Sequence, residues 1–166
     1  MADHFGKSLS GEDFSNQDLQ DDNFDECRLE KTNFESANLY GVGLSWSVLT
    51  EANFKGATLK WADVHSSYGI GASFEDADCE SANFTDCKLR GASFKGANLS
   101  HAELYNASLQ KVDFRGADLS GANLSHADLT GADLRGAILD GALIYDVDLT
   151  DANLEGVDLS KAVEKR

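Results

Sequence analysis

Large apolar residues recur at every fifth position of this chain, at residue numbers that end in 4 or 9. From Leu9 to Leu159 this frame has 31 positions, of which 19 are Leu and 8 are Phe, and only Gly69 and Cys79 lack a large apolar side chain. A period of five fits neither an α-helix nor a flat β-strand. The pattern therefore predicts a repeat architecture that extends along almost the whole chain.

The other positions of the five-residue unit are also restricted. Two residues before each frame position the side chain is small, and 19 of the 26 such positions from Ala37 to Ala162 are Ala. The residue directly before the frame position is often Asp or Asn, so the unit reads A-(D/N)-(L/F)-x-x. Because short Asx side chains accept backbone N–H groups at turns, we interpret this recurrence as structural rather than catalytic. Gly recurs at the last position, which indicates a repeated tight turn.

A second period of 20 residues is visible in the aromatic frame positions. Six Phe residues follow one another at this spacing and are the predicted core column: Phe14, Phe34, Phe54, Phe74, Phe94 and Phe114. Four units of five residues would make one coil, so residues 20 apart would stack at about 4.8 Å, the spacing between β-strands.

This repeated unit resembles that of the pentapeptide-repeat proteins over nearly the whole chain. The resemblance implies an all-β fold, a right-handed quadrilateral β-helix of about 7–8 coils of 20 residues, in which the frame residue and the small residue point inward. We expect a single solenoid domain over residues 1–166, with an N-terminal cap region at 1–13 and a short C-terminal tail at 160–166.

Departures from the repeat predict local irregularities. Gly69 removes a side chain from its column, so we expect either a void or a bulge that turns Ile70 inward. Polar residues occupy the small positions of the first coil, and we expect Phe5 to fold over that end as part of a cap. The three Cys occupy frame or small positions, so we expect buried, reduced thiols rather than a zinc site.

Outward aromatic residues gather near the Gly69 coil. The candidate interaction surface consists of Tyr40, Trp46, Lys60, Trp61, His65 and Tyr68. An exposed aromatic cluster can bind a partner. The alternative is that the Trp side chains lie over the corners of the coils and shield backbone.

The formal net charge is −15. A candidate acidic patch lies in the first quarter of the chain and consists of Asp21, Asp25, Glu26, Glu30 and Glu35. Such a charge disfavours direct binding to nucleic acid or to an anionic membrane surface, since like charges repel. No apolar run is long enough to span a membrane and no signal peptide is visible, so we expect a cytoplasmic protein.

One outward column alternates in sign. It reads Glu35, Lys55, Glu75 and Lys95 at 20-residue spacing, so we expect opposite charges to meet on adjacent coils.

Catalysis and cofactors are not expected, because the four His residues are scattered without a nucleophile or a metal partner at useful spacing. We favour a non-catalytic rod that acts as a scaffold or binds an unidentified protein. The alternative follows from the resemblance: quinolone-resistance members of the family are acidic DNA mimics that bind type II topoisomerases such as DNA gyrase. We also expect a weak homodimer through the C-terminal coil, whose edge offers unpaired backbone groups.

Overall fold

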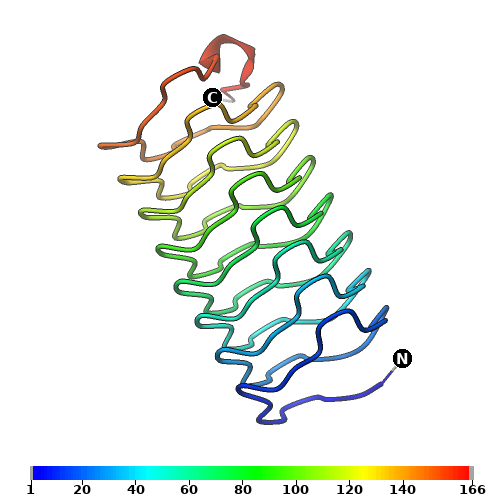
Figure 1. Ribbon diagram of the computed structural model, residues 1–166. Helices are drawn as coiled ribbons and strands as arrows, with labels where there is room; N and C mark the ends of the chain where they lie inside the picture. The colour runs from blue at the N-terminus through cyan, green and yellow to red at the C-terminus, as the bar shows by residue number, and fades with distance from the viewer. Residues whose placement is uncertain (1, 165–166) are drawn as a thin grey trace.

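The computed structural model describes residues 2–164, which form a stack of similar coils along one axis (Figure 1). Parallel β-bridges join residues 20 positions apart, from Asp3 with Asn23 to Leu143 with Val163. Each bridge is isolated, so no longer strand is formed, and the one helical element among the described residues is the 3-10 helix η1, Leu159–Lys161. The 20-residue period of the sequence is therefore the length of one coil. The handedness of the coil stays a prediction.

Backbone hydrogen bonds connect each coil to the coils on either side. The Phe54 N–H donates to the Ser73 carbonyl oxygen at 2.7 Å, and the Gly56 N–H donates to Glu75 O at 2.8 Å. In the opposite direction, the Asn53 N–H donates to Thr32 O at 2.9 Å. Three of the five N–H groups of a unit are thus used between coils, and this pattern repeats along the stack.

The remaining N–H groups form the corners. The Ala57 N–H donates to Phe54 O at 3.0 Å, which closes a four-residue turn, and Gly56 in that turn has a φ of +64°. A positive φ at the third residue is the signature of a type II turn. Because every unit contains such a turn, each coil has four. The interpretation of the recurrent Gly is confirmed, although many residues with side chains also adopt this conformation.

Asp and Asn before the frame positions complete these corners. The Asn53 side-chain oxygen accepts the Lys55 N–H at 3.1 Å, and Asp118 accepts the Ser120 N–H at 2.9 Å. Asn side chains also bond between coils, as when the Asn98 amide donates to Asp78 at 3.0 Å. The structural interpretation of the Asx position is therefore confirmed.

The core is a set of stacked columns. Phe34, Phe54, Phe74, Phe94 and Phe114 are fully buried, and consecutive rings stack with centroids 4.6 to 5.4 Å apart. Phe14, at the N-terminal end of the column, is partly buried and stacks on Phe34 at 5.3 Å. Each ring beyond the first coil therefore loses its contact with water and gains two aromatic neighbours or one.

The N-terminal end differs from the expectation for Phe5. His4 occupies the frame position of the first coil and stacks on Phe24, with ring centroids 4.4 Å apart. Phe5 is 54% exposed, because it follows the frame position and therefore points outward at the turn. The prediction that Phe5 folds over the end is wrong, and His4 extends the core column instead.

The coil at Gly69 keeps the regular register. The Gly69 N–H donates to Lys88 O at 2.8 Å, as a frame residue does, and Ile70 is 49% exposed. A Cβ placed on Gly69 would lie 2.8 Å from Cδ2 of Leu89, so the Leu89 side chain occupies the space that a Leu would have filled. The predicted bulge is wrong, because it would have broken the hydrogen bonds between coils while a neighbouring side chain could fill the gap.

The repeat changes at the C-terminal end. Asp158 caps η1 by accepting the Ser160 N–H at 3.0 Å, and the Gly141 N–H donates to Lys161 O at 2.9 Å, one residue beyond the regular partner. A surface hollow of about 340 Å³ lies beside this change, between Ile138 and Lys161. The frame residues of the last coil are only partly buried, since no further coil covers them.

Corresponding units of successive coils make four outer faces. We name them after their core columns: the first face belongs to the column of Leu44, the second to that of Leu49, the third to that of Phe54 and the fourth to that of Leu59.

Candidate functional site

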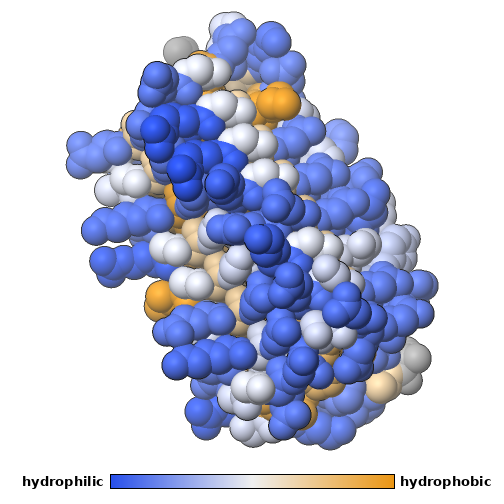
Figure 2. Space-filling model, viewed as in Figure 1, coloured by the Kyte–Doolittle hydropathy of each residue, from blue (hydrophilic) through white to orange (hydrophobic). Residues whose placement is uncertain are grey.

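Outward side chains come from three positions of each unit, the residue before the frame position and the two after it. The frame and small positions are buried along most of the stack. Figure 2 shows the result on one side of the molecule, where the surface is mostly hydrophilic and apolar atoms appear as separated spots. Any functional surface is therefore built from columns of side chains that repeat at the coil spacing.

Three residues of the candidate interaction surface lie on the fourth face. Tyr40 and Lys60 belong to the same column, and Trp61, which is 62% exposed, follows Lys60 at the turn. The Lys60 ammonium lies 2.8 Å from Glu80 and 3.2 Å from Asp78. These bonds, with Glu80 first, raise the pKa of Lys60. Lys60 is thus bound within the rod rather than offered as a free cation.

The other three predicted residues lie elsewhere. Trp46 and His65 share the first face, where their rings make an edge contact with centroids 6.1 Å apart. The His65 ring nitrogen Nδ1 lies 2.8 Å from Asp63. Tyr68 lies on the second face. The six residues therefore form two groups on neighbouring faces and one separate ring, and their role in binding stays a prediction.

The candidate acidic patch winds around the rod. Its five residues are close in sequence, but a coil needs only 20 residues to pass through all four faces. Asp25 and Glu26 lie on the first face, whereas Glu30, Glu35 and Asp21 lie on the second, third and fourth faces respectively. The acids form a belt around one end of the rod rather than a patch on one side.

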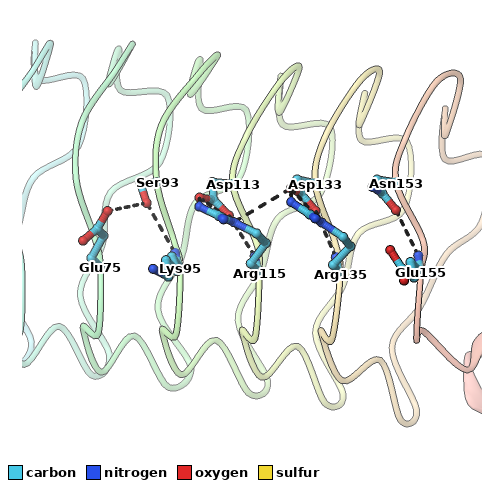
Figure 3. Close-up of polar contacts among 9 residues, drawn as sticks. All are labelled: Glu75, Ser93, Lys95, Asp113, Arg115, Asp133, Arg135, Asn153 and Glu155. Carbon is cyan, nitrogen blue, oxygen red and sulfur yellow. Dashed lines mark hydrogen bonds and ion pairs between the residues drawn. The ribbon is translucent and has the colours of Figure 1, made fainter.

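The third face carries a row of paired charges, shown in Figure 3. Arg115 bonds Asp113 at 2.6 Å through Nη2 and also lies 3.8 Å from Asp133 on the next coil. Arg135 bonds Asp133 at 2.7 Å. Hydrogen bonds from Arg115 and Arg135 lower the pKa values of Asp113 and Asp133 respectively. Each Arg in this row is thus neutralised mainly by the Asp two residues before it.

The predicted charge column on this face is realised in one pair. Lys55 lies 4.0 Å from Glu75, across adjacent coils. The other Glu75 oxygen accepts the Ser93 hydroxyl at 3.1 Å, which is also the contact that Figure 3 draws beside Lys95. Among the described residues no ion pair joins Glu35 to Lys55 or Glu75 to Lys95. The register is as expected, but polar neighbours compete for the same carboxylates.

Sequence reasoning missed an aromatic group in the C-terminal half of the first face. Tyr105 and Tyr145 each make an edge contact with His126, at 5.2 Å between ring centroids. The His126 ring nitrogen Nδ1 lies 3.0 Å from Asp146. The signal was present in the spacing, because steps of 21 and 19 residues lead to neighbouring positions one coil further on.

Charge is divided unequally among the four faces. Between residues 3 and 161, the outward positions of the second face hold five acids and five Lys or Arg, those of the third hold seven and four, and those of the fourth hold seven and two. The first face has no Lys or Arg at these positions, and its seven acids are Asp3, Asp25, Glu26, Asp63, Asp86, Glu103 and Asp146. About half of the net charge of the chain is therefore on one side of the rod.

Two further searches of the structure gave negative results. Within residues 2–164, no three His, Cys, Asp or Glu side chains gather in a way that could hold a metal ion. The same residues contain no helix of the length and apolar character needed to cross a membrane.

Comparison with known proteins identifies the repeat. A family model for pentapeptide repeats matches residues 27–65, 72–110, 107–144 and 127–163, which together make up more than half of the chain. The chain belongs to the pentapeptide-repeat family. Pentapeptide-repeat proteins are generally structural or interaction modules.

Solved structures of other pentapeptide-repeat proteins are similar to this chain. HetL from the cyanobacterium Nostoc sp., which is involved in the regulation of heterocyst differentiation, is 30% identical with a TM-score of 0.47, over 93% of this chain and 75% of HetL. Trypsin-treated QnrB1, a plasmid-mediated fluoroquinolone resistance protein, is 20% identical with a TM-score of 0.40, over 94% of this chain and 89% of QnrB1. A pentapeptide-repeat protein of the Arabidopsis thaliana thylakoid lumen is 27% identical with a TM-score of 0.22, over 97% of this chain and 70% of that protein. The comparison with curated proteins finds no match.

Proposed function

We propose that this chain is a non-catalytic rod that acts as a scaffold or protein-interaction module, built as a right-handed quadrilateral β-helix. The observation that carries the proposal is the separation of a filled apolar core from ordered outer columns of polar side chains. A catalytic site usually needs a concave pocket that encloses its reactive groups. In this rod the charged and aromatic side chains stand outward, where they suit contact with the surface of another protein.

Affinity capture with the intact protein tests this proposal. The native chain is compared with a variant in which outward residues of several faces are replaced by Ser while the core is unchanged. We expect one or a few proteins to be retained at a constant ratio by the native chain and lost with the variant. Identical retained proteins for both chains, or retention of none, would contradict an interaction role.

The acidic DNA mimic is the second candidate, and the net charge of −15 favours it. At about 4.8 Å per coil the rod is about 35–38 Å long, close to the roughly 34–36 Å of one duplex turn. Its charge corresponds to about one negative charge per 2.5 Å of length, against about one per 1.7 Å in duplex DNA. In this function the rod would occupy the DNA-binding surface of a type II topoisomerase and would not itself bind nucleic acid.

A DNA gyrase supercoiling assay distinguishes the two candidates. For a mimic, we expect the chain either to inhibit supercoiling or to restore it in the presence of a quinolone, in proportion to its concentration. Heat-unfolded protein at the same concentration is the control for the effect of added negative charge. Unchanged supercoiling in both conditions would eliminate the mimic and leave the interaction rod.

A further inference from the structure

The first face of the rod has a composition that no other face shares. It lacks Lys and Arg over seven coils, and its acids alternate with exposed aromatic rings. Trp46 is 59% exposed, and Tyr105 and Tyr145 are exposed to about two fifths of their surface. These rings contribute little to the core, so core packing does not explain their presence.

The acids of this face keep their charge uncompensated by strong cations. On the second, third and fourth faces, Lys or Arg side chains pair with neighbouring carboxylates. On the first face, the ion pairs among the described residues are those of His65 with Asp63 and of His126 with Asp146. Histidine is largely neutral at pH 7 at its ordinary pKa, so the face remains strongly negative.

The rings lie beside the carboxylates rather than in a separate region. Trp46 and His65 are in contact next to Asp63, and the Tyr105, His126 and Tyr145 group includes Asp146. An aromatic face attracts a cation through its quadrupole, and a nearby carboxylate strengthens that attraction through its charge. A surface with both groups and no cations of its own is complementary to Arg and Lys side chains.

From this arrangement we propose that the first face is the docking surface for a lysine- and arginine-rich segment of a partner protein. The segment lies along the rod axis, with its cations placed between the carboxylates and over the rings. The proposal rests on the interaction function proposed above and names the side of the rod and the chemistry of the partner. Charge complementarity directs the segment to this face, because the neutral second face offers no comparable attraction.

The test measures binding of a fluorescein-labelled peptide of alternating arginine and serine by fluorescence anisotropy, at low and at near-physiological ionic strength. The first-face variant combines Glu26→Gln, Asp86→Asn and Asp146→Asn. The matched control combines Asp21→Asn, Asp76→Asn and Asp151→Asn on the other three faces. All six residues are exposed and have positive φ at the same turn position, so both variants lose three charges from equivalent sites.

We expect the first-face variant to bind the peptide about tenfold more weakly than the native chain, and the control variant to bind within about twofold of it. A second variant, Trp46→Ala with Tyr105→Ala, should weaken binding about fivefold without a change in net charge. Circular dichroism and thermal unfolding of each variant show that the rod remains folded.

Equal weakening by the two charge variants would overturn the assignment, because it would show attraction to the whole acidic rod. Absence of binding by the native chain would also overturn it. Both results are distinguishable from failure of the interaction function, since affinity capture with the intact protein does not depend on the peptide or on this face.

Discussion

At the scale of single residues, inward and outward positions of the same unit should differ strongly in their effect on stability. Phe74 is fully buried between Phe54 and Phe94, with ring centroids at 4.8 and 4.6 Å. We expect Phe74→Ala to lower the free energy of unfolding by about 3–5 kcal/mol, because it leaves a cavity in the stack. Ser120→Ala, at an outward position, should change it by no more than about 0.5 kcal/mol. Equal urea midpoints for the two variants would contradict the assignment of inward and outward positions.

Cys87 belongs to a column of small side chains that bond the backbone. Its thiol donates to Val64 O at 3.1 Å, and one coil earlier the Ser67 hydroxyl donates to Leu44 O at 2.6 Å. Burial raises the pKa of Cys87 from its ordinary value of 9.0 to about 12. The folded chain therefore holds this proton at a pH at which the unfolded chain releases it, and stability falls as the pH rises between these two values.

Cys87→Ser tests this linkage with a residue that the same column already uses. The native chain should lose about 1.4 kcal/mol more stability than the variant between pH 8 and pH 10, because Ser does not titrate. Urea denaturation at both pH values measures the difference. The burial of Cys79 also raises its pKa, but that contribution is the same in both chains and cancels. An identical alkaline loss in the two chains would show that the Cys87 thiol ionises freely in the folded state.

At the scale of the turn, the left-handed position should distinguish glycine from other residues. Gly116 has a φ of +66° and no heavy atom within 4 Å of the place where a Cβ would lie, so Gly116→Ala adds backbone strain without a clash. We expect a loss of about 1 kcal/mol. Ser36 is exposed and has a φ of +57° at the equivalent position, so Ser36→Gly should have the opposite sign and gain about 0.5 kcal/mol. Thermal midpoints that move in the same direction would contradict this account of the turn.

At the scale of the whole molecule, the C-terminal end is the place where the rod is least complete. Ile144, Leu149, Leu154 and Leu159 are only partly buried, and no further coil pairs with the last one. We expect weak two-fold association through this end, because burial of these side chains and pairing of the free edge both favour contact. Light scattering over a concentration series should show the mean mass rising above that of one chain. A constant mass of one chain at high concentration would rule out the dimer.

Much of the fold could be predicted because the repeat is local. Each unit needs a small residue, an Asx, a large apolar residue and a permissive turn, and these preferences are visible in five consecutive residues. The 20-residue spacing of Phe34, Phe54 and Phe74 then indicated the length of a coil before any contact was known. These features follow from backbone geometry and from the need to bury apolar side chains, which the sequence states directly.

Side-chain competition and the grouping of distant residues were decided by the tertiary structure. Leu89 fills the space at Gly69, and His4 rather than Phe5 extends the core, because packing depends on which neighbouring side chain can reach a gap. The acids from Asp21 to Glu35 looked like a patch in sequence but pass around all four faces of the coil. The Tyr105, His126 and Tyr145 group has the opposite origin, since residues about 20 apart become neighbours when coils stack. The chain alone thus determined the five-residue unit and its repeat, whereas the surface that a partner would meet was decided by how the coils wind and stack.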